Sequence, residues 1–225
     1  MVYEIDSTQD AILELPVPEI TPGLVLAADV QTAGRGRGAR NWVAESGDAV
    51  LMSLVIPRPE VPAPVLAAVA AMYVLQPTNP NFSLKWPNDI VVDTGVEYEK
   101  IGGIIATAVG ELVVLGVGIN LRMDPDSRPV SNARGLEDYG VRFNRDTLLL
   151  LYLDAVERLM KFPAETVLAM YRAACSTLGK NVRALEVSGN AIVGRASKIA
   201  DDGSLILEIS EGEISLNAVD VEYLR

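Results

Sequence analysis

The spacing of apolar and polar residues changes along the chain, and these changes predict the order of its elements. Short apolar runs and alternating stretches are typical of strands. They predict strands over Val2–Ile5, Leu24–Ala28, Ala49–Ile56, Asp89–Asp93, Lys100–Val109 and Leu112–Ile119. Gly110 and Glu111 separate the last two strands, which predicts a tight hairpin between them.

Apolar residues at helical spacing predict four helices. Ser7 and Thr8 stand where a helix cap is expected, ahead of a helix from about Gln9 to Leu15. The other helices are predicted over about Val65–Leu75, Arg145–Met160 and Pro163–Cys175.

After Gly179 the pattern becomes one of short alternating strands. Turn signals separate these strands at Ser188-Gly189-Asn190, Asp202-Gly203 and Glu211-Gly212. We therefore expect one large domain over residues 1–178 and a small all-β barrel over residues 179–225.

The composition narrows the chemistry. The chain has 225 residues, no histidine and one cysteine, Cys175. These counts exclude Ser-His-Asp or Cys-His catalysis, a histidine-based zinc or haem site and an intramolecular disulfide. Oxygen-ligated ions such as Mg²⁺ are then the metals to expect, and the single cysteine favours the cytoplasm. The N-terminus lacks a signal-peptide pattern and prolines interrupt the uncharged segment 61–84, so we expect no membrane span.

The charge is acidic and unevenly spread. The formal net charge of −11 argues against broad nucleic-acid binding. Residues 1–34 contain no Lys or Arg, and then Arg35, Arg37 and Arg40 follow one another closely. They belong to Gly34–Arg40, where glycines alternate with arginines directly after a strand. This segment suits a polyphosphate clamp, and a flexible RNA-binding loop is the alternative.

Three further motifs combine charge, amides and glycine. Lys85-Trp86-Pro87-Asn88-Asp89 fits either a ligand site or a plain type I turn with a half-buried Trp. Lys100-Ile101-Gly102-Gly103 and Gly116-Val117-Gly118-Ile119-Asn120 place glycines on strands. Glycine leaves room for a ligand against a sheet, and a β-bulge or close strand packing would also select it.

Five segments together, in this order, resemble the biotin protein ligases over nearly the whole chain: Ser7-Thr8, Gln31 with Gly34–Arg40, Lys85–Asp89, Lys100–Gly103 and Gly116–Asn120. The resemblance implies an α+β fold, a mixed sheet flanked by helices like that of class II aminoacyl-tRNA synthetases, with a C-terminal SH3-like β-barrel. It also implies an activity. ATP would activate biotin to biotinoyl-5′-AMP, and the biotinoyl group would pass to a lysine of the biotin carboxyl carrier protein.

The resemblance also implies roles for residues of this chain. Biotin would be bound by Ser7, Thr8, Gln31, Gly34, Arg35, Arg37, Lys100, Gly103 and Gly116. ATP or the adenylate would be bound by Arg37, Arg40, Trp42, Lys85, Asn88, Gly118 and Asn120. Lys100, Arg35 and Arg37 are the candidate catalytic cations, and Mg²⁺ would be held through the phosphates with Asn88 and Asn120. The biotin carboxylate is already a nucleophile, so only the second step needs a proton acceptor, for which Asp89 is a hypothesis from its position.

The chain departs from the family pattern in two places. The loop usually reads Gly-Arg-Gly-Arg-x-Gly-Arg, whereas Gly38 and Ala39 stand here in exchanged order, so we expect the second half of the loop to order differently. Gln9 stands where Asn is commoner. Ser7 lies so near the start that we expect no N-terminal DNA-binding domain and no nucleic-acid partner.

Two other functions fit parts of the pattern. A lipoate or octanoate ligase would share the catalytic fold, and a non-catalytic biotin-binding protein would share the pocket. The carrier protein of the carboxylase, the role of the barrel and the association of two copies into a homodimer are left open by the sequence.

Overall fold

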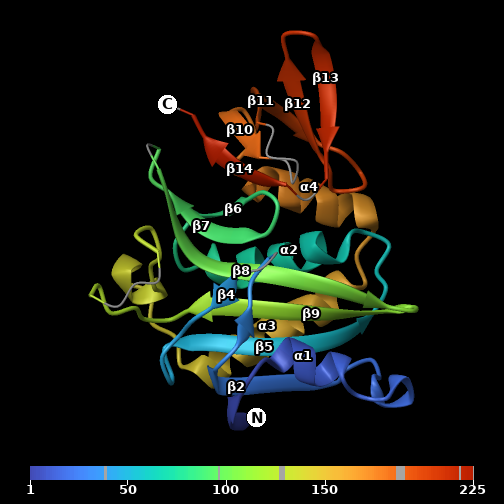
Figure 1. The fold of residues 1–225 in the computed structure, drawn as a ribbon, viewed down its shortest axis with the longest axis vertical. Coiled ribbons are helices and arrows are strands. Elements are labelled where there is room, and N and C mark those ends of the chain that lie inside the picture. Colours follow the sequence, from blue (N-terminus) through green and yellow to red (C-terminus); the bar gives the residue numbers. More distant parts are fainter. Residues whose placement is uncertain (38–39, 96, 127–129, 186–190, 218, 225) are drawn as a thin grey trace.

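A seven-stranded sheet forms the centre of the larger part of the molecule (Figure 1). The structure is a computed structural model and describes residues 1–37, 40–95, 97–126, 130–185, 191–217 and 219–224. The strand order is β1-β2-β5-β9-β8-β7-β6, with bounds β1 Val2–Ile5, β2 Val25–Gln31, β5 Ala49–Pro57, β6 Phe82–Lys85, β7 Asp89–Asp93, β8 Tyr98–Val109 and β9 Leu112–Asn120. β1 is parallel to β2 and the other neighbours are antiparallel, so the expected mixed sheet is confirmed.

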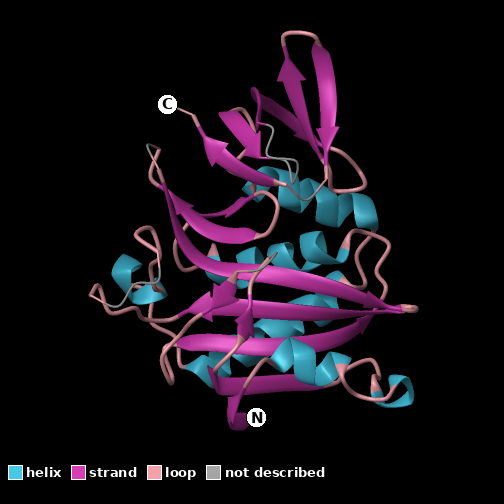
Figure 2. Cartoon of the chain, viewed as in Figure 1, coloured by secondary structure: helices cyan, strands magenta, loops and turns pink. Residues whose placement is uncertain are grey.

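The two faces of this sheet are packed differently (Figure 2). Leu54 and Leu115 belong to the main core with the helices α2 (Ala63–Leu75), α3 (Arg145–Leu159) and α4 (Ala164–Ala174). Their neighbours along each strand, Val55 and Val114, pack instead with Ile12 of α1 (Thr8–Leu13). Alternate strand residues point to opposite faces, so α1 lies on the face opposite to the long helices. No helix among the described residues is both long and apolar enough to cross a membrane.

Small side chains allow α2 to lie in the middle of the core. Ala67, Ala70 and Ala71 are fully buried, and the helix packs against the sheet, α3 and α4. Tyr152 of α3 is also buried, and its hydroxyl donates to the Ala67 carbonyl over 3.0 Å. Burial raises the pKa of Tyr152, so this hydroxyl keeps its proton and the hydrogen bond persists.

A second sheet is formed by the C-terminal residues at one end of the molecule (Figure 1). Its order is β13-β12-β11-β10-β14, with β10 Asn181–Leu185, β11 Ala191–Ile199, β12 Leu205–Ile209, β13 Gly212–Leu216 and β14 Asp220–Tyr223. The turns at Asp202-Gly203 and Glu211-Gly212 are confirmed. The turn predicted at Ser188-Gly189-Asn190 lies outside the described residues, and closure into an SH3-like barrel stays a prediction.

Contacts of Trp86 join the two sheets. Its indole nitrogen donates to the Gly203 carbonyl over 2.9 Å, and its backbone nitrogen donates to Thr177 Oγ1 over 3.0 Å. Trp86 is only 2% exposed, so the half-buried ring of the plain-turn alternative is not found, although residues 86–88 do form a turn. The β6–β7 turn brings the backbones of Lys85 and Asp89 together and includes a cis Trp86-Pro87 peptide.

The boundaries of several elements differ from those predicted. The first helix ends at Leu13 rather than Leu15, with Ser7 as its N-cap. β2 begins at Val25 and extends to Gln31, three residues beyond the predicted strand. β6 was missed because Pro80 and Pro87 flank its four residues, and the short hairpin of β3 (Gly34–Arg35) and β4 (Asn41–Trp42) was missed as well.

The hydroxyl of Tyr152 provides a test of the core. We expect Tyr152→Phe to lower the free energy of unfolding by about 1 kcal/mol, because it removes one buried hydrogen bond and leaves the ring in place. Urea denaturation followed by circular dichroism measures this loss. Tyr73→Phe is the matched control, since Tyr73 is 46% exposed, and an equal effect in both variants would contradict the assignment.

Candidate functional site

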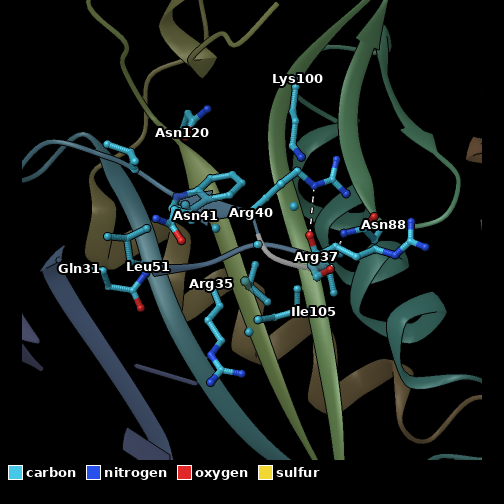
Figure 3. A pocket seen from close by; sticks show the side chains of 18 of the residues that line it. Gln31, Arg35, Arg37, Arg40, Asn41, Leu51, Asn88, Lys100, Ile105 and Asn120 are labelled. Atoms are coloured by element: carbon cyan, nitrogen blue, oxygen red, sulfur yellow. Dashed lines mark hydrogen bonds between the residues drawn. The ribbon is translucent and has the colours of Figure 1, made fainter. Parts of the chain in front are cut away.

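One cavity of about 270 Å³ lies on the α1 side of the central sheet and brings together most of the predicted site residues (Figure 3). Those that line it are Ser7, Thr8, Gln31, Arg35, Arg37, Arg40, Trp42, Asn88, Lys100, Gly103, Gly116, Gly118 and Asn120. Asp89 lines it as well. Gly34 and Lys85 do not line it, so their predicted contacts with a ligand there have no support from the cavity.

Glycines on β9 make room for the cavity. Gly116, Gly118 and Asn120 alternate along the strand and share one face, while Leu115, Val117 and Ile119 point into the core. A Cβ at Gly116 would lie 2.7 Å from Ile105 Cγ1, and a Cβ at Gly118 would lie 2.6 Å from Trp42 Cε2. Both distances are shorter than a carbon–carbon contact, so larger residues would displace the cavity wall.

A β-bulge places Lys100 beside Gly103, Gly116 and Gly118, which together form the glycine floor of the cavity. The β7–β8 register shifts so that Val91 pairs with Lys100 and Ile90 with Gly102, which leaves Ile101 as an extra residue. The bulge reverses the alternation, and Lys100 and Gly103 come to the same face. A Cβ at Gly103 would lie 3.6 Å from Lys100 Nζ. A bulge and a ligand site were alternative interpretations of these glycines, and the structure has both a bulge and a cavity.

Lys100 is held by an ion pair within the cavity. Its Nζ lies 2.6 Å from Asp89 Oδ1, and both side chains are largely buried. The ammonium also lies 5.7 Å from the centroid of the Trp42 ring, a cation–π contact. The Lys100 backbone donates to the Asn132 carbonyl over 2.7 Å. Lys100 therefore points into the cavity from a fixed backbone, with Asp89 as its counter-ion.

Lys85 lies behind this pair and not in the cavity wall. Its side chain is buried, and its Nζ lies 4.2 Å from the centroid of the Tyr98 ring and 5.8 Å from that of Tyr223 on β14. Burial lowers the pKa of Lys85, and the Asp89 carboxylate opposes this shift. Lys85 thus lies outside the cavity lining, and its place beside the phosphates stays a prediction.

The arginine segment forms a small hairpin over the cavity, because Gly34 pairs with Trp42 and Arg35 with Asn41. Figure 3 shows Arg37 and Arg40 close together near Lys100, while Arg35 points the other way. Arg35 forms an ion pair with Asp10 of α1 at 2.7 Å. The exchanged pair Gly38 and Ala39 lies outside the described residues.

Asp220 of the C-terminal sheet binds two of these arginines. Its Oδ1 accepts from Arg37 Nη1 over 2.8 Å and from Arg40 Nη2 over 3.0 Å, and Arg37 also donates to the Val219 carbonyl over 3.1 Å. Burial lowers the pKa of Arg37 and the Asp220 carboxylate opposes this shift. A carboxylate thus occupies guanidinium donors that would otherwise be free to bind a phosphate.

The Trp42 ring lies flat against the glycine floor. Its carbon atoms are the nearest neighbours of the space above Gly118 and Gly103. Its Nε1 is buried and has no hydrogen-bond partner among the described residues. The ring forms one wall of the cavity, and the stacking of a base on it stays a prediction.

Two asparagines present oxygen atoms that suit magnesium. Asn88 Nδ2 donates to the Ile104 carbonyl over 2.8 Å, and Asn120 Nδ2 donates to the Arg134 carbonyl over 3.0 Å. Each bond anchors the amide nitrogen and leaves Oδ1 as the group that can face a ligand, and Asn120 Oδ1 is buried without a partner among the described residues. The described part of the chain also contains no group of three Cys, Asp or Glu side chains that could hold a metal ion. Mg²⁺ held mainly through phosphate oxygens stays a prediction.

Hydroxyl and amide groups of Ser7, Thr8 and Gln31 form a further wall of the cavity, the hydroxyl wall. Gln31 Oε1 accepts from the Thr8 backbone nitrogen over 2.7 Å and from Thr8 Oγ1 over 3.0 Å. Ser7 Oγ accepts from the Asp10 nitrogen over 3.3 Å at the helix N-cap. Ser7 and Thr8 are almost fully buried, so their polar groups serve either the fold or a ligand in the cavity.

Sequence reasoning missed several residues at this site. Ser53 and Gln9 line the cavity, and Asp220 and Tyr223 reach it or its surroundings from β14. Ser53 lies in an apolar strand and was overlooked as a lone polar residue; its position in the middle of Ala49–Pro57 was the available signal. Asp220 and Tyr223 carry no motif, and only the packing of the two sheets reveals them.

The cavity can bind a ligand with two chemically different ends. One wall offers hydroxyl and amide groups, and the other offers the cations Lys100, Arg37 and Arg40 beside two amide oxygens. Such an arrangement is typical of an enzyme that brings a carboxylate to a phosphate, because fixed cations offset the repulsion between the two anions.

Comparison with known proteins agrees with this class. The Biotin/lipoate A/B protein ligase family matches residues 1–124, and the Biotin protein ligase C terminal domain matches residues 177–223. The biotin–[acetyl-CoA-carboxylase] ligase of Mycobacterium tuberculosis is 34% identical over 217 residues, 90% of this chain and 80% of that protein. The bifunctional ligase/repressor BirA of Bacillus subtilis is 30% identical over 241 residues, 97% of this chain and 71% of that protein.

Solved structures show the same fold. The biotin protein ligase from Aquifex aeolicus in complex with biotin and ATP aligns with a TM-score of 0.82 at 24% identity, covering 100% of this chain and 97% of that one. The chain belongs to the biotin/lipoate protein ligase family, among its biotin protein ligases.

The ion pairs of Asp220 predict how the arginine hairpin is held. We expect Asp220→Asn to increase tryptic cleavage at Arg35, Arg37 and Arg40 by roughly twofold to fivefold, because an exposed ion pair contributes up to about 1 kcal/mol. Limited proteolysis followed by mass spectrometry measures the rate at each site. Asp201→Asn is the control, since Asp201 lies between β11 and β12 and pairs with Arg172 of α4, 2.7 Å away, rather than with the arginine hairpin. Unchanged cleavage in Asp220→Asn would contradict the tether.

Proposed function

We propose that this protein activates biotin with ATP to form biotinoyl-5′-AMP and pyrophosphate, and then transfers the biotinoyl group to a lysine of a biotin carboxyl carrier protein. The observation that carries the proposal is the cavity itself. It combines a hydroxyl and amide wall, a glycine floor and the cations Lys100, Arg37 and Arg40. Membership of the ligase family supports the same reaction.

In the first step the biotin carboxylate attacks the α-phosphorus of ATP and pyrophosphate leaves. Ser7, Thr8 and Gln31 bind the ureido ring, and Gly103 and Gly116 leave room for the ring system. Lys100 contacts the carboxylate and the α-phosphate, where it offsets the charge that grows in the transition state. The ion pair with Asp89 positions its ammonium before the ligand binds. No general base is required, which agrees with the absence of histidine.

The nucleotide occupies the other half of the cavity in this proposal. Trp42 stacks on adenine, and Arg37 and Arg40 turn from Asp220 to the phosphates. Gly118 permits close approach of the Trp42 ring to β9. Asn88 and Asn120 would contribute oxygen ligands to Mg²⁺, which supplies positive charge to the phosphates when bound.

In the second step the amine of the carrier lysine attacks the activated carbonyl, AMP leaves, and the amine must lose a proton. Asp89 is the carboxylate nearest to Lys100, at 2.6 Å, and it lines the cavity. We assign it two roles: it holds Lys100 in the first step and accepts the proton in the second.

The other candidate functions have less support. An octanoyltransferase requires a catalytic cysteine, and Cys175 is buried outside the cavity lining, where burial also raises the pKa of its thiol. The relatives named above are biotin ligases rather than lipoate ligases. A non-catalytic biotin-binding protein would have no use for the cation cluster beside the glycine floor.

The carrier partner is proposed from the relatives. The M. tuberculosis protein is named for acetyl-CoA carboxylase, and we propose a carboxylase carrier domain as the acceptor here. We keep the proposed division between residues 1–178 and 179–225. Both parts contribute to the site, because Asp220 and Tyr223 belong to the second part.

Pyrophosphate exchange tests the first step. With biotin, we expect rapid incorporation of labelled pyrophosphate into ATP, and less than about 1% of that rate with lipoate or octanoate, because polar groups left unpaired reject a poor substrate. Lys100→Met should lower the exchange rate by at least about a hundredfold. Lys161→Met is the control on an exposed helix end. Exchange that depends on lipoate, or no exchange at all, would refute the proposal.

Asp89→Asn tests the second step. Supplied with preformed biotinoyl-5′-AMP, this variant should transfer biotin to a carrier domain at least about a hundredfold more slowly than the wild type, because the proton acceptor is gone. Pyrophosphate exchange should fall less, since asparagine retains an oxygen near Lys100. Single-turnover transfer measures the first quantity. Transfer at the wild-type rate would remove Asp89 from the mechanism.

A further inference from the structure

Four polar side chains form a continuous line along the hydroxyl wall of the cavity, and two of them have no role in the chemistry above. The line runs from Gln31 through Thr8 and Ser53 to Gln9. Thr8 Oγ1 lies 3.0 Å from Gln31 Oε1 and 2.9 Å from Ser53 Oγ, and Ser53 Oγ donates to Gln9 Oε1 over 3.0 Å. Thr8, Gln9 and Ser53 are each at least 97% buried, with exposures of 3%, 2% and 0%.

Both ends of the line are hydrogen-bond acceptors. Gln9 Nε2 donates to the Val114 carbonyl over 3.0 Å and to Thr107 Oγ1 over 3.3 Å. A carbonyl can only accept, so the amide nitrogen of Gln9 faces Val114 and its oxygen faces Ser53. A backbone N–H can only donate, so the oxygen of Gln31 faces the Thr8 nitrogen.

The hydrogens along this line are all in use. Two hydroxyls lie between two amide oxygens, and each hydroxyl carries one hydrogen. The hydrogen of Ser53 goes to Gln9 Oε1, and that of Thr8 goes to Gln31 Oε1 or to Ser53 Oγ. Neither hydroxyl keeps a hydrogen for a ligand. Toward the cavity, Thr8 Oγ1 therefore offers only a lone pair.

We propose that Gln9 and Ser53 set the hydrogen-bond polarity of Thr8, so that this hydroxyl accepts a hydrogen from the ligand and does not donate one. The inference rests on the proposed function, in which the ligand is biotin. The group that Thr8 selects is a ring N–H of a cyclic urea. Gln9 and Ser53 act through Thr8 and are positioning residues for the recognition of this group.

Ser7 has the opposite polarity. Its oxygen accepts a hydrogen bond from the Asp10 N–H at the helix N-cap, and its own hydroxyl hydrogen has no acceptor among the described residues. Ser7 can therefore donate to a ligand while Thr8, the next residue, accepts from it. A donor beside an acceptor matches the carbonyl and the adjacent N–H of a cyclic urea.

The test compares biotin with its two cyclic carbamate analogues, in each of which one ring N–H is replaced by oxygen. Calorimetric titration of the wild type without ATP gives each dissociation constant. One analogue should bind at least about a hundredfold more weakly than biotin, because its ring oxygen faces an acceptor. Equal binding of biotin and both analogues would overturn the proposal, and this comparison requires no variant.

Two variants then separate polarity from packing. In Gln9→Met the hydrogen of Ser53 is released and can pass to Thr8 Oγ1. Thr8 then no longer donates to Ser53 and shares its own hydrogen between Gln31 Oε1 and the ligand, so the discrimination should fall below about tenfold. In the double variant Gln9→Met with Ser53→Ala the released hydrogen is removed as well, and we expect at least about a tenfold recovery of the discrimination. Loss of packing alone would make the double variant worse than the single one, and that result would overturn the proposal.

Thr107→Val is the matched control. It removes the weaker contact of Gln9 at 3.3 Å and leaves the Val114 contact that orients the amide, so the discrimination should stay as in the wild type. The failures of the two proposals are distinguishable. A wild type that binds biotin selectively but shows no pyrophosphate exchange refutes the ligase function alone. Biotin-dependent exchange together with a Gln9→Met variant that discriminates like the wild type refutes the polarity proposal alone.

Discussion

The absence of side chains at three positions of β8 and β9 is the constraint on which the site depends. The central sheet is packed on one face by long helices, so a cavity can form only on the other face. There Gly103, Gly116 and Gly118 leave a space into which Trp42, Gln9 and Lys100 project from three different segments. A Cβ at Gly116 or Gly118 would overlap with one of these side chains or with Ile105. The floor and the walls are thus two consequences of the same steric condition.

Charge is balanced locally within this acidic protein. The net charge of −11 repels a phosphate that approaches from a distance. At the cavity, however, positive side chains are gathered, and each is paired with a carboxylate. Lys100 is paired with Asp89, and Arg37 and Arg40 are paired with Asp220. Such pairs keep the cations oriented without a ligand, and an incoming phosphate competes with a carboxylate rather than with bulk water. Exchange of one anion for another costs less reorganisation than the ordering of free side chains.

The C-terminal sheet takes part in the site through one strand and one turn. β14 contributes Asp220 to the arginine hairpin and Tyr223 to the environment of Lys85. The turn at Gly203 accepts the indole hydrogen of Trp86, which lies in the motif between Lys85 and Asp89. Burial raises the pKa of Tyr223 to about 12, so its hydroxyl remains neutral beside Ser176 and Thr177. These polar contacts join the two sheets in addition to the apolar core that they share.

The sequence by itself determined the strands, the helices and the kinds of residue at the site. Periodicity, glycine and proline act over a few residues, so β1, β7 and the β8–β9 hairpin could be predicted to within two residues. The motif Gly34–Arg40 likewise indicated a polyphosphate site, and Lys85–Asp89 and Gly116–Asn120 were compatible with a ligand site. β6 was missed because Pro80 and Pro87 flank it, and prolines are read as signals of turns and loops.

Only the tertiary structure decided how these residues act on one another. The bulge at Ile101 brings Lys100 and Gly103 to one face, and it follows from pairing with β7 rather than from a local pattern. The pairing of Arg37 with Asp220 and the line from Gln31 to Gln9 connect residues far apart in the chain. Ion pairs and hydrogen bonds depend on distances of about 3 Å, which packing alone establishes.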